Sequence, residues 1–123
     1  MGRRMGLFSK KVVQATIHGI QLKIRGGPEP LPPPLIGAYV TAFSIAEEPR
    51  EAVVKGVRAI QAMGYDFEDV LPEGLSMPLS DWAKYVGEAW PEFTEEFPAQ
   101  SEIAARLADN GVVFSPFAGF DSA

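Results

Sequence analysis

His18 is the one histidine in the chain, and histidine is the side chain whose ordinary titration lies near neutral pH. That property suits a general base, and a histidine base works best when a carboxylate orients its imidazole ring. Asp66, Glu68 or Asp69 would be suitable if their strand lay beside the one that carries His18. The simpler interpretation is that a histidine next to Gly19 is a turn residue. We therefore predict no catalytic site and keep His18, Asp66 and Glu68 as the alternative.

The sequence patterns that hold metals and cofactors are missing. The three carboxylates named above could bind a hard cation such as Mg²⁺, but the spaced oxygen ligands of a calcium loop do not occur. No phosphate-binding or dinucleotide-binding glycine pattern is found, and no serine stands in a nucleophile-elbow sequence. The chain has no cysteine, which excludes disulfides and thiolate chemistry. We predict no metal site and no cofactor.

The densest unusual feature is an aromatic and acidic segment that runs from Trp82 to Phe97. It holds five large aromatic residues within these 16 positions, interleaved with glutamates. Aromatic residues anchor protein interfaces, and an acidic rim selects a basic partner. The alternative is that the rings cap one end of a sheet as a satellite core. The residues that we predict to bind a partner are Trp90, Phe93, Phe97, Glu92, Glu95 and Glu96.

Charge is distributed unevenly along the chain. Residues 1–25 carry six basic side chains and no acid, a sum of +6, whereas the other 98 residues carry 5 basic and 16 acidic ones, a sum of −11. Because the aromatic residues lie among acids, the phosphates of nucleic acid would be repelled. We expect a basic protein partner, with an acidic surface that serves only solubility as the alternative. No apolar run approaches the length that spans a bilayer, and we expect a cytoplasmic protein.

The elements that position these residues begin with a β-α-β unit. The apolar run from Gly37 to Ile45 predicts a strand. The helical spacing from Pro49 to Met63 predicts a helix that starts at a proline and stops at Gly64. Gly56 in the middle of this helix suggests a close approach to a sheet. A further strand is predicted from Tyr65 to Leu71, and its alternating polar residues indicate one wet face.

Flanking segments complete the predicted order β-β-α-β-α-α-β. The first strand runs from Lys11 to Arg25, and its apolar alternation changes phase at His18-Gly19, which predicts a glycine bulge or, as the alternative, a hairpin tip. The proline-rich stretch 26–34 and residues 72–78 are predicted loops. A helix capped by Ser80 spans residues 81–89, and another starts at Pro98 or Ser101, with Ile103, Ala104 and Leu107 buried. The final strand is expected at residues 112–114.

This order predicts an α+β fold: a two-layer sandwich in which a four-stranded mixed or antiparallel sheet carries its helices on one face. The strands on either side of the Pro49 helix should lie parallel, with room for another strand between them. In element order alone the chain resembles the ferredoxin-like (split β-α-β) architecture in a permuted or modified form. That architecture hosts unrelated functions, so it implies no functional residue.

Residues 1–10 are expected to form a basic, flexible N-terminal extension, and residues 11–123 a single domain. The leading functional hypothesis is a non-catalytic protein-interaction domain of a small bacterial-type protein, for example an immunity or inhibitor protein that binds a basic partner. One alternative is a small enzyme or ligand-binding domain with a pocket between sheet and helices that uses His18 and the carboxylates of the strand predicted at residues 65–71. The other is a self-associating module, a homodimer formed through Phe114, Phe117 and Phe120, because the C-terminal tail is unusually apolar.

Overall fold

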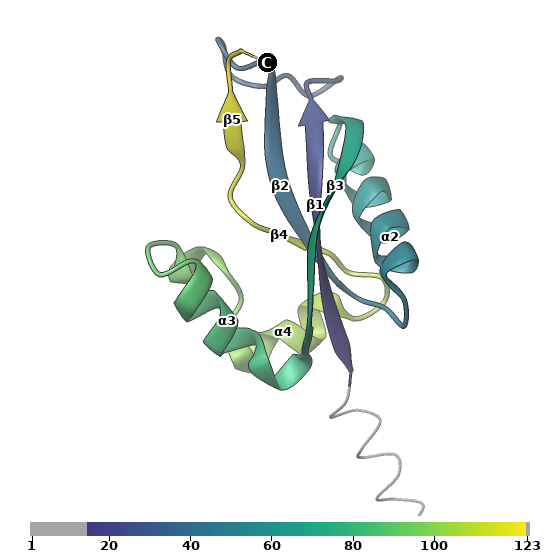
Figure 1. The fold of residues 1–123 in the computed structure, drawn as a ribbon, viewed down its shortest axis with the longest axis vertical. Coiled ribbons are helices and arrows are strands. Elements are labelled where there is room, and N and C mark those ends of the chain that lie inside the picture. The colour runs from purple at the N-terminus through teal and green to yellow at the C-terminus, as the bar shows by residue number, and fades with distance from the viewer. Residues whose placement is uncertain (1–14, 123) are drawn as a thin grey trace, which may run out of the picture.

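A computed structural model describes residues 15–122 of the chain, so the predicted N-terminal extension lies outside the described residues (Figure 1). They form an α+β fold of one five-stranded sheet and three α-helices. The strands are β1 (Thr16–Arg25), β2 (Gly37–Ile45), β3 (Asp66–Pro78), β4 (Val113–Phe114) and β5 (Ala118–Phe120). The helices are α2 (Pro49–Ala62), α3 (Trp82–Ala89) and α4 (Gln100–Leu107). Within this part of the chain, no helix is long and apolar enough to cross a membrane.

The strands follow the order β3-β1-β2-β4, and β5 pairs with the same edge of β2 as β4 does, giving five strands where four were predicted. Every pairing is antiparallel. Since β2 and β3 both pair antiparallel with β1, they run parallel to each other on either side of it. The two strands joined by α2 therefore share one sheet with another strand between them, as predicted.

The predicted bounds of β2 and α2 are confirmed almost residue for residue. Pro49 occupies the first turn of α2, where its missing N–H costs nothing, and Gly64 follows the helix with φ +93°, a left-handed conformation that favours glycine. Gly56 is buried where the helix crosses the sheet, so the predicted close approach is also confirmed.

Alternate side chains of β1 and β2 enter two separate cores on opposite faces of the sheet. Ile17 and Phe43 lie on the face covered by α3 and α4, whereas Leu22 and Val40 lie on the face covered by α2. We call these the two-helix core and the one-helix core. The two-helix core consists of Ile17, Phe43, Met77, Trp82, Val86, Phe97, Ile103, Leu107 and Val113. The one-helix core consists of Ile20, Leu22, Ile24, Ala38, Val40, Ala42, Ala46, Ala52 and Ile60.

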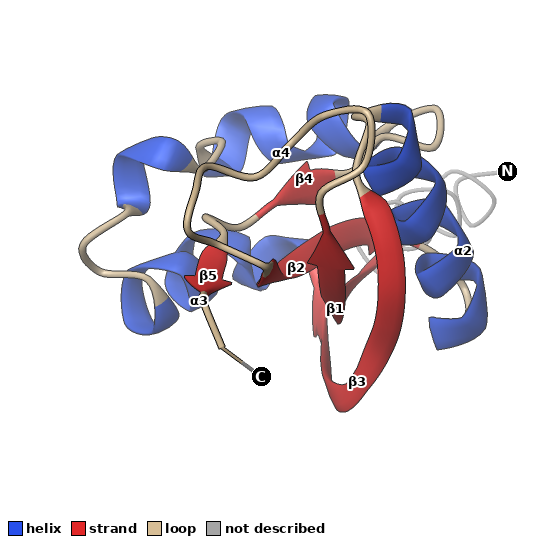
Figure 2. Cartoon of the chain, turned by 90° about the horizontal axis from the view of Figure 1, so that it is seen from above, coloured by secondary structure: helices blue, strands red, loops and turns tan. Residues whose placement is uncertain are grey.

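This arrangement corrects two predictions. Helices do not lie on one face only: α2 lies on one side of the strands and α3 on the other (Figure 2). The change of apolar phase at His18-Gly19 is neither a bulge nor a hairpin tip, because β1 pairs with β2 without interruption from Ile17 to Ile24. The phase changes because β1 leaves the two-helix core and enters the one-helix core on the opposite face.

Strand β3 is much longer than predicted, because residues 72–78 continue it instead of forming a loop. It pairs only with β1 and so forms one edge of the sheet, where a proline can sit with its missing N–H directed to solvent. The register shifts twice along this pairing, between Ile20 and Leu22 and between Lys23 and Ile24 of β1. Neither shift lies at His18-Gly19, which pair in regular register with Ser76 and Leu75.

Two further predictions about the C-terminal half need correction. Helix α3 begins at Trp82 without a side-chain cap, so Ser80 does not cap it, and Ala104 of α4 is exposed although it was predicted to be buried. Ile103 and Leu107 are buried as predicted.

The apolar tail folds back on the chain itself. Phe114 and Phe117 pack against the one-helix core, and Phe120 of the unpredicted strand β5 lies with its ring centroid 5.2 Å from that of Tyr39. These contacts account for the apolar character of the tail within one chain. A homodimer through the three phenylalanines stays a prediction.

Candidate functional site: an acidic aromatic surface

The aromatic and acidic segment is held to the two-helix core at both of its ends. Helix α3 ends before Pro91, which cannot continue it, and the backbone then turns through residues 90–97 with N–H to carbonyl bonds from Phe93 to Trp90 and from Glu96 to Phe93. At the far end, the indole N–H of Trp82 donates to the carbonyl of Pro98 at 2.8 Å. The loop is therefore fixed by hydrogen bonds as well as by packing.

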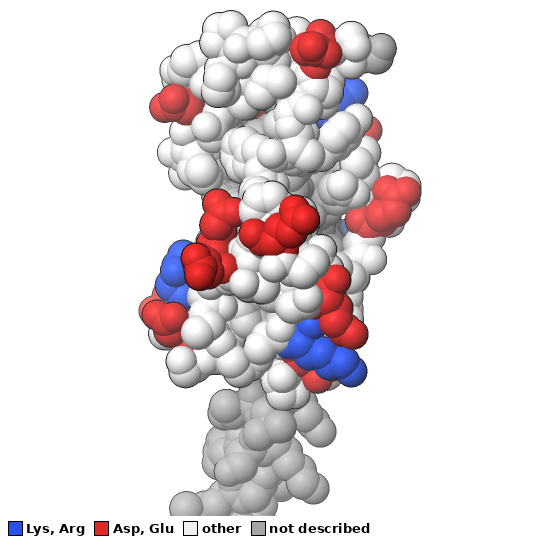
Figure 3. Space-filling model, turned by 90° about the vertical axis from the view of Figure 1, so that its left-hand side faces the viewer, with Lys and Arg blue, Asp and Glu red and all other residues white. Residues whose placement is uncertain are grey.

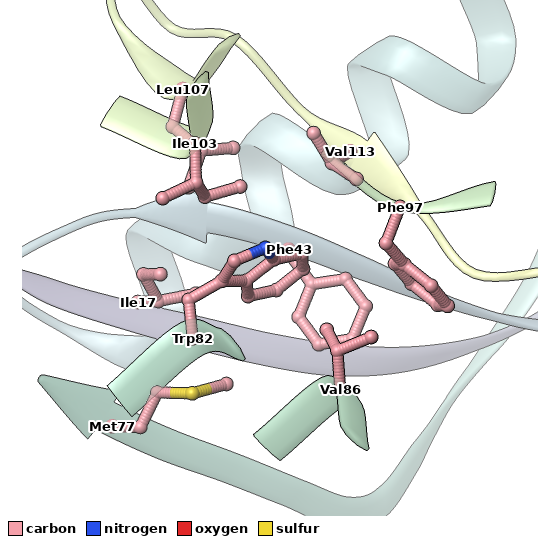
Figure 4. Packing of buried hydrophobic residues seen from close by; sticks show 9 residues of the cluster. All are labelled: Ile17, Phe43, Met77, Trp82, Val86, Phe97, Ile103, Leu107 and Val113. Atoms are coloured by element: carbon pink, nitrogen blue, oxygen red, sulfur yellow. The ribbon is translucent and has the colours of Figure 1, made fainter. Parts of the chain in front are cut away.

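Four aromatic rings form a continuous series from the core to the surface. Phe43 of β2 is fully buried, and its ring centroid lies 6.3 Å from that of Phe97. Phe97 contacts Trp90 at 5.7 Å, and Trp90 contacts Phe93 at 6.0 Å. Figure 4 shows the inner part of this series, in which Phe43 and Phe97 converge with Trp82 on the two-helix core. The outermost ring, Phe93, is 38% exposed.

Exposed acids surround the outer rings. Between residues 81 and 96 the chain carries five acids and one base, Lys84, which gives a sum of −4, and all six of these side chains are exposed. Figure 3 shows acidic side chains gathered at mid-height on the face that carries α3. We use the name acidic aromatic surface for the exposed and half-buried members of this segment: Trp90, Phe93, Glu88, Glu92, Glu95 and Glu96.

The structure divides the six predicted binding residues. Glu92, Glu95, Glu96 and Phe93 are exposed, and Trp90 is half-buried, with its indole N–H donating to the hydroxyl of Tyr85 at 3.2 Å. Phe97 is buried in the two-helix core, where it cannot touch a partner in this conformation. The two interpretations of this segment therefore each describe part of it: Phe97 belongs to a core at one end of the sheet, and Phe93 to the surface.

His18 lies apart from this surface, on the face of the sheet that α2 covers. It is 5% exposed and stands directly opposite Ser44 of β2 and Ser76 of β3. Its Nε2 lies 3.1 Å from the carbonyl oxygen of Ala46, and its Nδ1 lies 2.8 Å from the hydroxyl oxygen of Ser76. Since a carbonyl only accepts, the neutral ring donates from Nε2, and Nδ1 accepts the Ser76 proton.

The carboxylates proposed as partners of His18 lie elsewhere. Asp66 lies opposite Arg25 in the backbone register of β3 against β1, at the other end of β1 from His18. Glu68 forms ion pairs with Lys23 (2.9 Å) and with Arg25. The hydrogen bonds from Lys23 and Arg25 lower the pKa of Glu68, and the bond to Glu68 raises the pKa of Lys23. The predicted group of His18, Asp66 and Glu68 is thus not brought together. Within residues 15–122, no cluster of three or more metal-ligating side chains occurs.

Sequence reasoning missed both serines beside His18. Ser76 was placed in a loop, and its contact with His18 spans 58 positions, which no local pattern reports. Ser44 is 1% exposed, and its hydroxyl has no hydrogen-bond partner. Its place between Phe43 and Ile45 in a mostly apolar strand was a signal, because buried polar side chains without a hydrogen-bond partner are rare.

The chain matches no protein-family model, no curated protein and no solved structure.

Proposed function

We propose that this chain is a protein-interaction domain that binds a basic partner protein through the acidic aromatic surface. The observation that carries the proposal is the exposed ring of Phe93 at the outer end of a ring series that is anchored in the core. Protein interfaces are centred on aromatic anchors whose side chains lose little freedom on binding. Contact with Trp90 supplies that restraint for Phe93 before any partner arrives.

The surrounding charge sets the chemistry of the partner. A sum of −4 over residues 81–96 attracts lysine and arginine side chains and speeds their approach. A cation that reaches this surface can also stack on the exposed ring of Phe93. The same charge repels the phosphates of nucleic acid.

This chemistry suits an inhibitor of a basic effector, such as an immunity protein that neutralises a toxin, and we include a cytoplasmic location in the proposal. For the fold, we propose that the β2-α2-β3 unit with β1 between its strands is a permuted form of the ferredoxin-like architecture.

An NMR titration with an unstructured arginine-rich peptide tests the proposal. We expect amide shifts to concentrate in residues 88–97 and to weaken as salt is added, because exposed charges are screened. The double variant Glu95→Gln/Glu96→Gln should bind more weakly than the wild type. The matched control is Glu47→Gln/Glu48→Gln, which removes the same charge from another exposed site. Equal weakening by the two double variants would show that net charge, and not this surface, attracts the peptide.

A second comparison tests the aromatic anchor. Phe93→Ala should weaken peptide binding by about tenfold, since truncating an interface anchor typically costs more than 1 kcal/mol. Met63→Ala is the control, because Met63 is another large apolar side chain with comparable exposure (46%) on the far side of the fold. If Phe93→Ala binds as the wild type does, the ring is not part of the binding surface.

A further inference from the structure

A second site that does not depend on the proposed interaction surface lies at the free edge of β3. We propose that Ser76 is an activated nucleophile that accepts acyl groups from small esters with apolar acyl chains, with His18 as its general base. No local pattern in the sequence indicates this pair, because the two residues meet only through the pairing of β1 with β3. Four features of the structure support it.

The first feature is the bond between nucleophile and base. The Ser76 hydroxyl oxygen lies 2.8 Å from Nδ1 of His18, within the range in which a proton can pass to the ring. Ser76 itself is exposed at the sheet edge, whereas His18 is 5% exposed. A reagent in solution can therefore reach the hydroxyl while the base stays enclosed.

The second feature is the third group, which orients the base. Nε2–H of His18 donates to the carbonyl of Ala46 at 3.1 Å, and this bond fixes the tautomer that leaves Nδ1 free to take a proton. A carbonyl dipole at this position also favours the charged ring that forms when the proton arrives. The carbonyl of Ala46 thus occupies the position that a carboxylate holds in a serine–histidine–aspartate triad.

The third feature is a donor for the oxyanion. Leu79 N–H donates inward to the carbonyl of Ala15, and N–H groups alternate in direction along a strand. The N–H groups of Met77 and Leu79 therefore point toward β1, and that of Ser76 points to the free edge of β3. Pro78 has the same outward position, which is where a residue without N–H is tolerated. The Ser76 N–H can then bind the oxygen of an acyl group that lies along this edge.

The fourth feature is a place for the acyl chain. A pocket of about 350 Å³ borders Ser76 on the α3 side of β3, the face opposite to the one that holds the Ser76 hydroxyl and His18, and the side chains around it include Leu75, Met77 and Tyr85. Its charged lining residues are Lys84, Asp81 and Glu88, so the oxyanion depends on the Ser76 N–H and not on the charge of the pocket. An acyl chain in this pocket would lie on one face of β3, and its ester carbonyl would pass around the free edge of the strand to reach the Ser76 hydroxyl on the other face.

The reaction balances with an ester and water alone. The Ser76 oxygen bonds to the acyl carbon while its proton passes to Nδ1 of His18, and the bond from the acyl carbon to the alcohol oxygen then breaks as that proton passes to the departing alcohol. Water then attacks the acyl-serine, gives its proton to His18 and releases the acid, and the Ser76 hydroxyl is restored. The net change is hydrolysis of the ester to an acid and an alcohol.

Labelling of the full chain with an alkyl fluorophosphonate, followed by intact-mass and peptide analysis, tests the proposal. We expect one adduct on Ser76 of the wild-type protein. Ser80→Ala, which removes another exposed serine four positions away, should be labelled at the wild-type rate, whereas Ser76→Ala should not be labelled. Absence of an adduct on the wild type, or an adduct at another residue, would overturn the proposal without recourse to any variant.

The role of His18 has a test of its own. His18→Gln should slow labelling of Ser76, and hydrolysis of p-nitrophenyl butanoate, by about 100-fold, at the lower end of what general-base catalysis contributes. Thermal unfolding of the variant shows whether it is folded at the assay temperature. A folded His18→Gln protein that is labelled at the wild-type rate would exclude His18 as the base.

Discussion

Gly56 of α2 lies directly against Ala42 of β2: a Cβ atom added to the glycine would be 3.0 Å from the Cβ of Ala42 and 3.6 Å from Cδ1 of Leu22. Ala42 is buried in the one-helix core, and β2 lies inside the sheet, so neither can move away without disturbing its neighbours. Helix α2 can therefore lie this close to the sheet because residue 56 has no side chain.

Gly56→Ala should destabilise the protein although alanine is the better helix former. The gain in helix propensity is about 1 kcal/mol, and overpacking a filled core costs about 1–3 kcal/mol, so we expect a net loss of about 1 kcal/mol. Gly87→Ala in α3 is the matched control, because no atom lies within 4 Å of the added Cβ, and it should stabilise by about 0.5–1 kcal/mol. Urea unfolding measures both. Equal gains at the two positions would contradict the close seating of α2.

Ser44→Ala should raise the free energy of unfolding by about 1 kcal/mol. The Ser44 hydroxyl is buried without a partner, and removing an unsatisfied polar group removes its desolvation cost. Ser115 is the control, since it is equally buried but its hydroxyl oxygen accepts from Thr41 N–H at 2.9 Å and donates to the carbonyl of Pro116. Ser115→Ala should cost about 1–3 kcal/mol. A loss of stability in Ser44→Ala would show that its hydroxyl has a partner in solution.

The aromatic series predicts losses of stability of different size for its buried member Phe97 and its exposed member Phe93. Phe97→Ala removes a buried ring and should cost about 3–5 kcal/mol in unfolding free energy, whereas Phe93→Ala should cost no more than about 1 kcal/mol. Chemical denaturation of the two variants, followed by tryptophan fluorescence, decides the matter. Similar losses at both positions would place Phe93 in the core and remove it from the proposed interface.

Glu68 should make the stability depend on pH in the acidic range. Its pKa in the folded protein lies below its ordinary value of 4.5, first because of the hydrogen bond from Lys23 and then because of that from Arg25. A carboxylate with a lowered pKa stabilises the folded state above the unfolded pKa, and this contribution is lost as the pH falls through the folded value. Glu68→Gln should therefore reduce the loss of stability below about pH 4.5.

The same ion pair acts in the basic range with the opposite sign. The pKa of Lys23 is raised above 10.5 by its bond to Glu68, so its contribution is present below that value and is lost as the pH rises through the folded pKa. Glu51→Gln is the control for acid unfolding, since exposed Glu51 forms a longer ion pair with half-buried Lys55, at 3.9 Å. If Glu51→Gln and Glu68→Gln change the acid profile equally, the network around Glu68 has no special effect.

The sequence was sufficient to predict an element and its bounds where residues that start or stop the element flank a regular pattern of buried apolar residues. Pro49, Gly64 and the apolar spacing between them predicted α2, and the uninterrupted apolar run predicted β2 with its observed bounds. β1 was harder to interpret, because its period-two pattern serves two cores on opposite faces. A change of phase caused by a change of core looks the same in a sequence as a bulge does.

The remaining features depend on pairings that are distant along the chain. β3 continues through Pro72 and Pro78 only because it is an edge strand, and edge position is a property of the sheet order. The segment around Phe93 was recognised by composition, but only the packing separates it from buried Phe97. The bond from Ser76 to His18 required the register of β1 against β3, which no local pattern encodes.

The two cores have a consequence for the way the chain finds its alignment. A slip of β1 by one residue against its neighbours exchanges the sides of all its side chains. In a sheet with one buried face, such a slip exposes one apolar row, but here it would turn Ile17 away from α3 and α4 and Leu22 away from α2 at the same time. A misaligned β1 would therefore lose buried apolar contacts on both faces of the sheet at once, and this loss selects a single pairing for the central strands.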